Sequence, residues 1–189
     1  MNKYFMIAIC FLVLLFVASQ SQAGSNYIFG YRLDYATKEI KASQIDSAFP
    51  DFNYGHTSAF FLRRTFGSNF YFEVGPGAWN SEKDAAQLTY QYNSIGLGVM
   101  SGGSVFFDLG LHIGAGLLSL STGDQKIGEV QTAATVFRNE IGLYMANAGI
   151  GYKFGDWSLI AEVRHIGFFE KIVQNLDVTT AGVVIMTSL

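Results

Sequence analysis

The chain has 189 residues, half of them apolar, with 17 Phe, 10 Tyr, 21 Gly and only 2 Pro, and its formal net charge is −3. This length suits one domain, and a mildly acidic chain without a basic stripe argues against nucleic acid as a partner. The single cysteine, Cys10, lies near the N-terminus, so the rest of the chain has no disulfide or thiolate metal site. The three His residues lack metal-ligand spacing, and we expect no cofactor.

Residues 1–23 have the three parts of a secretory signal peptide. A short positive start at Lys3 precedes an apolar run over residues 5–18, and Ser21 and Ala23 supply the small residues of a cleavage site. We expect cleavage after Ala23, which leaves residues 24–189 as the mature barrel domain. A membrane anchor is the alternative, but the run is short for a spanning helix.

After the signal, short segments of alternating apolar and polar residues recur, each followed by turn residues. The first covers residues 27–35, where Tyr, Phe and Leu occupy one parity and Gly, Arg and Asp occupy the other. Such alternation predicts a strand with one apolar face. Further strands are predicted over residues 57–66, 70–79, 88–100, 105–117, 142–154, 157–168 and 178–189.

The connections between these eight predicted strands alternate in length. The short ones are residues 67–69, 101–103 and 155–156, and the longer ones are residues 37–56, 80–87, 120–141 and 169–177. An even number of strands, with short turns at one end and long loops at the other, is typical of outer-membrane barrels. We therefore predict an all-β fold, an eight-stranded antiparallel transmembrane β-barrel in the outer membrane of a Gram-negative bacterium.

A soluble lipocalin-like barrel is the alternative, with its apolar face turned inward around a ligand. Few charges and many Gly on the non-aromatic face favour the membrane barrel, because a small barrel interior needs small residues. We interpret the polar residues on inward parity as a structural core rather than a catalytic interior or a pore. They are Arg32, Asp34, Arg64, Glu73, Asp108, His112, Glu162 and Arg164.

His165 breaks the pattern of the seventh strand. Trp157, Leu159 and Val163 occupy the parity that faces lipid, and His165 continues it. A polar group that faces hydrocarbon costs free energy unless it is partnered. The residue is therefore either an interfacial side chain above the hydrocarbon or part of a functional site.

The eighth strand supplies partners for this histidine. Asp177 and Thr179 share the outward parity of Val183, and strands seven and eight form a hairpin. Residues on one face near the mouth of a hairpin come within side-chain reach. A His beside an Asp is half of a hydrolytic triad, in which the acid orients the imidazole that activates a nucleophile.

The segment "VRHIGFFEKIVQNLDVTTAGVVI" resembles the C-terminal signature of the outer-membrane lipid A 3-O-deacylases. Arg164 and His165 are in place, Asn175 lies ten residues after the His, and Gly182 lies seventeen after it. The upstream segments "DLGLHIGAGLLS" and "AGIGYKFGDWSL" are also similar. The resemblance covers roughly the last 90 residues.

This resemblance implies that lipid A of the outer leaflet is the partner and that an acyl ester of lipid A is hydrolysed. It also implies a catalytic His and Ser on the lipid-facing wall and an acidic residue on the next strand. The chain departs from the pattern at the Ser position, which is Gly167, at the following Asn, which is Phe168, and at the acid position, which is Thr179. Asp177 lies on the same face and can replace that acid.

Two functions follow. The first is a lipid A ester hydrolase, in which His165 is the base, Asp177 orients it, Asn175 supports the site, and water or another hydroxyl attacks. The second is an inactive barrel that binds lipid A or stabilises the envelope, with His165 at the interface. Gly167 favours the second, because a glycine cannot attack an ester. A soluble ligand-binding barrel is a more distant third.

Overall fold

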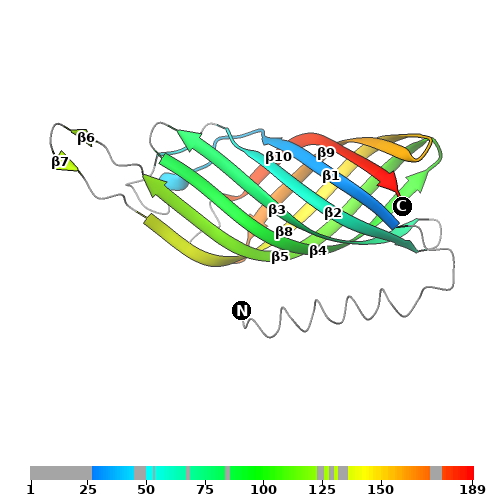
Figure 1. Ribbon diagram of the computed structural model, residues 1–189, viewed down its shortest axis with the longest axis horizontal. Helices are drawn as coiled ribbons and strands as arrows, with labels where there is room; N and C mark the ends of the chain where they lie inside the picture. The colour runs from blue at the N-terminus through cyan, green and yellow to red at the C-terminus, as the bar shows by residue number, and fades with distance from the viewer. Residues whose placement is uncertain are drawn as a thin grey trace.

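The computed structural model describes residues 27–44, 50–52, 54–66, 69–83, 86–122, 126–127, 130–131, 136–170 and 176–189. In these residues eight strands close into one antiparallel barrel, in the order β1-β10-β9-β8-β5-β4-β3-β2 (Figure 1). The predicted all-β barrel is confirmed. The predicted signal peptide lies outside the described residues, and none of the helices in the described residues is long and apolar enough to cross a bilayer.

The strands of the barrel have the following bounds. They are β1 Tyr27–Ala36, β2 His56–Phe66, β3 Phe70–Lys83, β4 Ala86–Gly102, β5 Val105–Thr122, β8 Val136–Phe154, β9 Trp157–Phe168 and β10 Val178–Ser188. A separate two-stranded sheet contains β6 Lys126–Ile127 and β7 Val130–Gln131, and a 3-10 helix, η1, covers Ala42–Gln44.

The two ends of the barrel differ. At one, here called the turn end, β8 meets β9 through Gly155 and Asp156, and both β1 and β10 have their free ends (Figure 1). Gly155 has a φ of 64°, a left-handed conformation that glycine adopts without strain. The opposite end, the loop end, is uneven in height, because β4, β5 and β8 have 17 to 19 residues and β1, β2, β9 and β10 have only 10 to 12.

Two predicted connections are shorter than expected. The predicted connection at residues 80–87 is wrong, because the ladder between β3 and β4 continues from Asn80↔Thr89 to Lys83↔Ala86. The predicted connection at residues 120–141 also contains the end of β5 and the start of β8. Both errors have one cause. At these strand ends the outward residues are polar, whereas the sequence pattern of a lipid-facing strand requires outward residues that are apolar.

Strand β5 shows how the polarity changes along the barrel. Near the turn end, Leu109 and Leu111 point outward and are 55% and 69% exposed, while Asp108 points inward and is fully buried. Near the loop end, Ser119 points outward and Leu118 points inward, where it is fully buried. The apolar face of the same strand is therefore outside in one half of the barrel and inside in the other.

The other strands change polarity at a similar level, which divides the barrel into a belt half and a loop-end half. In the belt half, large apolar side chains are exposed all round the outside, and we call them the apolar belt. The belt includes Phe29, Phe60, Phe70, Leu97, Leu109, Leu111, Ile113, Ile150, Leu159, Val163, Val183 and Ile185. Such a belt, on strands that pack polar groups inside, is the surface of a membrane barrel.

The interior of the belt half is a network of paired charges. Arg63 donates to Glu73 at 2.8 Å and to Asp108 at 2.7 Å, and Arg32 contacts Glu73 at 3.1 Å and Glu162 at 2.7 Å. All five side chains are at most 3% exposed. Pairing of this kind offsets part of the cost of removing these charges from water, and removing one partner would leave the other charge buried and uncompensated. The predicted structural polar core is confirmed for Arg32, Glu73, Asp108 and Glu162.

One member of that predicted core is placed wrongly and another is missing from it. Arg63, absent from the prediction, is the arginine that points inward. Arg64 lies on the opposite face of β2 near the turn end, where the rings of Tyr27 and Phe66 cover its guanidinium at 5.6 and 5.3 Å. The two adjacent arginines could not be told apart from the sequence, because the alternation of β2 weakens at its end.

Apolar side chains close the interior at both ends of the network. The turn-end core consists of Ile28, Phe61, Phe106, Ile160, Val184 and Met186. The larger loop-end core includes Trp79, Leu88, Tyr90, Leu118, Leu120, Ile141, Leu143, Ile166 and Phe168. Among the described residues the lumen is therefore filled by side chains, as expected for a barrel of this size.

Part of the connection between β1 and β2 folds over the loop end. Ile40 and Phe52 exchange backbone hydrogen bonds of 2.7 and 2.9 Å, and both side chains are buried in the loop-end core. Asp51 accepts hydrogen bonds from the hydroxyl and backbone N–H of Ser43, and the hydroxyl bond in particular lowers the pKa of the Asp51 carboxyl below its usual value. Lys83 of β3 donates to the Asp51 carbonyl at 2.8 Å.

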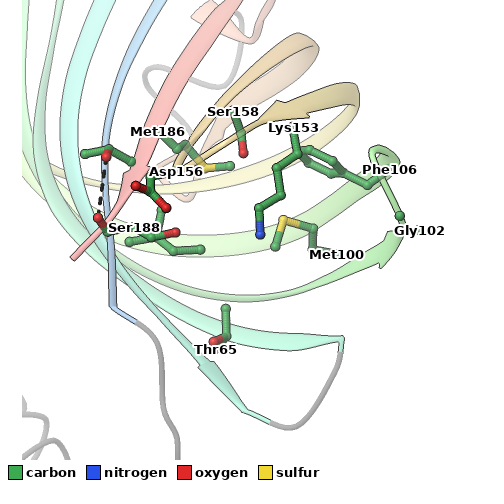
Figure 2. Close-up of a pocket in the computed structure, with 12 residues that line it drawn as sticks. Thr65, Met100, Gly102, Phe106, Lys153, Asp156, Ser158, Met186 and Ser188 are labelled. Carbon is green, nitrogen blue, oxygen red and sulfur yellow. Dashed lines mark hydrogen bonds between the residues drawn. The ribbon is translucent and has the colours of Figure 1, made fainter.

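A cavity of about 220 Å³ opens at the turn end (Figure 2). Met100, Phe106 and Met186 form apolar parts of its lining, and Lys153 and Asp156 are among its charged residues. It contains none of the residues that the sequence singled out for catalysis. Because the turn-end core lies beneath it, this cavity is a recess in the barrel end.

Candidate outer-wall site at the edge of the apolar belt

His165 lies on the outer wall of β9 where the apolar belt ends. Below it on the same face, Leu159 and Val163 are 44% and 52% exposed, and the His165 side chain is 44% exposed. The residue belongs to the short side of the barrel, three residues before Phe168, which ends β9. An imidazole at that level reaches both the hydrocarbon and the polar layer above it.

Asp177, just before β10, faces His165. Its Oδ2 lies 4.0 Å from His165 Nε2, which is within ion-pair range but too long for a hydrogen bond. Its Oδ1 accepts the backbone N–H of Phe168 at 3.3 Å. The end of β9 therefore holds the carboxylate beside the imidazole, and the two groups form an ion pair only when His165 is protonated.

Thr179 is the direct cross-strand neighbour of His165. It lies outward and half-buried, and its backbone carbonyl accepts hydrogen bonds from both the hydroxyl and the N–H of Thr37 at 2.8 Å. Directly opposed residues in an antiparallel pair have Cβ atoms about 4.5–5.5 Å apart. Thr179 thus places a hydroxyl within side-chain reach of the imidazole.

Tyr144 on β8 completes the site, and sequence reasoning missed it. It is the cross-strand partner of Gly167, and its ring lies 6.0 Å from the His165 ring. Its hydroxyl lies near the Asp177 carboxylate. A side chain at Gly167 would overlap the end of the Tyr144 ring, so the ring occupies the space that a serine there would need.

Two further residues of the predicted pattern have other positions. Phe168, at the position of the family's Asn, points inward and stacks on Trp79 at 6.4 Å and against Tyr90 at 5.3 Å in the loop-end core. Asn175 lies outside the described residues. Phe168 therefore supports the wall behind the site through packing.

The start of the connection after β9 is tied to β8. Both carboxylate oxygens of Glu170 accept the backbone N–H of Gly142, at 2.9 and 3.0 Å, and the N–H of Phe169 donates to the Gly142 carbonyl. The Phe169 ring lies 5.5 Å from that of Tyr144. These contacts hold Tyr144 against the site from the loop side.

The site therefore brings together one imidazole, one carboxylate, and the hydroxyls of a tyrosine and a threonine on an exposed wall. In the described ranges, no three His, Cys, Asp or Glu side chains gather where they could hold a metal ion. Asp177 lies near both the His165 imidazole, at 4.0 Å, and the phenol of Tyr144.

Comparison with known proteins bears on the fold. No family model matches the chain, and neither does any curated protein. Among solved structures, the chain is similar to Neisserial surface protein A, with a TM-score of 0.63 and 11% identity over 88% of this chain and 100% of that one. It is also similar to Ail, the attachment invasion locus protein of Yersinia pestis, with a TM-score of 0.53 and 12% identity over 87% and 97%. The chain has the fold of the small eight-stranded outer-membrane β-barrels.

Proposed function

We propose that this protein is an outer-membrane β-barrel of a Gram-negative bacterium whose wall around His165 contacts lipid A without cleaving it. The apolar belt and the fold support the location. The lack of cleavage is supported by one observation, the packing of Tyr144 over Gly167. That ring stands where a serine nucleophile would have to project.

The position of the site supports lipid A as the partner. The site lies at the edge of the apolar belt nearest the loop end, which in this orientation is the outer leaflet. Lipid A has its acyl chains in the hydrocarbon and its polar headgroup above them. His165, Thr179 and Tyr144 present hydrogen-bonding groups at that boundary, and Val163 lies below them against the chains.

Native mass spectrometry of the detergent-solubilised barrel with added lipid A tests this contact. We expect lipid A to remain bound to the wild-type protein and its apparent affinity to fall several-fold in His165→Ala and in Tyr144→Ala, because each loses a side chain at the headgroup level. Thr187→Ala, on the outer wall of β10 near the turn end, is the matched control. Equal retention by all four proteins would overturn the proposed lipid site.

One observation favours a second function, ester hydrolysis: Thr179 and Asp177 both lie next to His165. In this reaction the Thr179 hydroxyl attacks the ester carbonyl while His165 takes its proton. The ester C–O bond breaks, the leaving alcohol receives that proton, and a water then hydrolyses the threonyl ester to free acid. Asp177 stabilises the imidazolium in both steps.

The threonyl ester gives this second function its own test. If Thr179 attacks, intact-protein mass spectrometry after incubation with lipid A shows an added acyl chain in the wild type and in Thr179→Ser, and none in Thr179→Val. Thr→Val keeps the shape of the side chain and removes the hydroxyl. An absence of acylated protein together with an unchanged substrate excludes this reaction and leaves the lipid contact as the function.

A further inference from the structure

We infer that the outer face of the tall side of the barrel is a docking surface for the neutral sugars of lipopolysaccharide. We call this face the polar wall and define it by Asn80 on β3, Thr89, Gln91 and Asn93 on β4, and Ser119 on β5. The inference rests on the proposed outer-membrane location, and it concerns a surface separate from His165.

The polar wall stands directly above the apolar belt. Its residues continue the outward faces of β3, β4 and β5, where the belt members Leu97, Ile113 and Leu111 lie closer to the turn end. From Ile113, β5 continues to Thr122. In register with β5, the wall residues lie two to six positions beyond Ile113, from Asn93↔Ala115 to Thr89↔Ser119, so at about 3.3 Å per residue and a tilt of roughly 40° they stand about 5–15 Å above it. In the outer leaflet that layer contains the saccharide of lipopolysaccharide.

The wall residues are adjacent across the ladder. Asn80 pairs with Thr89, and Thr89 pairs with Ser119 on the other side. Gln91 and Asn93 follow Thr89 on the same face, with Gln91 between Ala78 and Leu117. Amides and hydroxyls thus form one continuous patch across three strands.

The hydrogen-bonding groups of this patch are unused within the part of the chain that the structure describes. None of the five side chains has a hydrogen bond or ion pair to a described residue, and Gln91 and Asn93 are exposed. Each amide offers two donors and an acceptor, and each hydroxyl offers both roles. Sugar hydroxyls have the same dual character, so the two surfaces can exchange donors and acceptors.

The charges favour sugars over phosphate or a charged protein. Charged outward residues border the wall, with Glu82 on β3 and, on β8, Arg138 opposite Ser119 and Glu140 opposite Leu117. The Glu82 carboxylate accepts a hydrogen bond of 3.2 Å from the Gln87 amide. The centre of the polar wall is neutral, which does not match the anionic groups of the lipid A headgroup but does match uncharged hexoses.

The wall is also held in a fixed shape. Behind it, Trp79, Tyr90 and Leu118 are fully buried in the loop-end core. The ladders between β3, β4 and β5 continue unbroken through this level. A preorganised surface loses little conformational entropy on binding, which suits weak polar contacts to a saccharide.

Thermal unfolding of the barrel in three bilayers tests the inference: phosphatidylcholine alone, with lipid A, and with lipopolysaccharide that carries a core oligosaccharide. A ligand that binds only the folded state raises the unfolding midpoint. We expect the wild-type midpoint to be about 5 °C higher with lipopolysaccharide than with lipid A. We expect this difference to vanish in a variant with all five wall residues changed to Ala.

Smaller changes keep the test informative if the fivefold variant does not fold. Gln91→Ala and Asn93→Ala should each remove part of the difference between the two lipids, and Thr187→Ala near the turn end should remove none. Equal wild-type midpoints in lipid A and lipopolysaccharide would overturn the inference alone. Failure of the wild type to insert into phosphatidylcholine would instead overturn the proposed membrane location.

Discussion

The belt half and the loop-end half of the barrel have opposite polarity on the same strands. In the belt half Leu111 is outside and Asp108 inside, and in the loop-end half Ser119 is outside and Leu118 inside. A strand in hydrocarbon must hide its polar side chains, and a strand in water must hide its apolar ones. The level of the change therefore marks the membrane boundary, and His165 lies at that level.

The difference also explains why the two interiors are built differently. In the belt half the inward side chains include paired charges around Glu73. In the loop-end half, Trp79 and Tyr90 pack inside among aliphatic residues. The largest expected effect comes from the first interior. Changing Glu73→Gln leaves Arg32 and Arg63 with one partner fewer and should lower the free energy of unfolding by about 3–5 kcal/mol.

Urea unfolding in liposomes measures that loss. Glu82→Gln, on the same strand but exposed in the loop-end half, should change the free energy of unfolding by less than about 0.5 kcal/mol. Similar losses in the two variants would contradict the division of the barrel into two halves.

An outward charge gives the next largest contrast. Leu111→Arg places a cation in the middle of the apolar belt and should cost about 2–4 kcal/mol. Gln91→Arg places the same side chain on the polar wall, in water, and should be nearly neutral. The same unfolding experiment compares them, and a strongly destabilised Gln91→Arg would put the membrane boundary higher than the level of His165.

The packing of Tyr144 over Gly167 has a smaller expected effect. Gly167→Ser inserts atoms where the end of the Tyr144 ring lies, and because that ring is exposed and can shift, we expect a cost of about 1 kcal/mol. Tyr144→Ala in the same chain should recover most of that loss, so the two substitutions should be strongly non-additive. Additive effects in this double-mutant cycle would mean that the ring and residue 167 do not compete for space.

The smallest expected effect concerns the connection over the loop end. The pKa of Asp51 is lowered in the folded state, so this group stabilises the fold above its unfolded pKa of about 4, and the stabilisation is lost as the pH falls through the lower folded value. We expect limited proteolysis of residues 37–55 to increase below about pH 4. Ser43→Ala removes the hydrogen bond from the Ser43 hydroxyl to Asp51, so the pH at which proteolysis begins should rise. An unchanged pH of onset would contradict the role of Ser43.

The sequence predicts the belt half well and the loop-end half poorly, for a physical reason. Alternation with apolar residues outward identified β5 and β9 because lipid selects that pattern. Asn80 and Gln87 are polar residues that point outward above the membrane. A strand segment that faces water in this way has the same composition as a loop, so it was predicted as one. The alternation alone does not say whether the apolar face of a strand points outward or inward. That depends on whether the segment lies inside the membrane or above it.

The site was predictable only in part. His165, Asp177 and Thr179 share a parity on neighbouring predicted strands, and a hairpin register brings them together. Tyr144 was missed because an outward aromatic residue on β8 is indistinguishable from the aromatic residues of the belt. Its contact with Gly167 depends on the register between β8 and β9, which no sequence pattern specifies here.

Mass spectrometry of lipid A from outer membranes with and without this protein expressed tests the proposed lack of cleavage most directly. His165→Ala and the paired Tyr144→Ala/Gly167→Ser variant accompany the wild type, each checked for membrane insertion. We expect an unchanged lipid A profile with the wild type, because Tyr144 fills the position of the missing nucleophile. Loss of a 3-hydroxyacyl chain that requires His165 would contradict this and establish the barrel as an esterase.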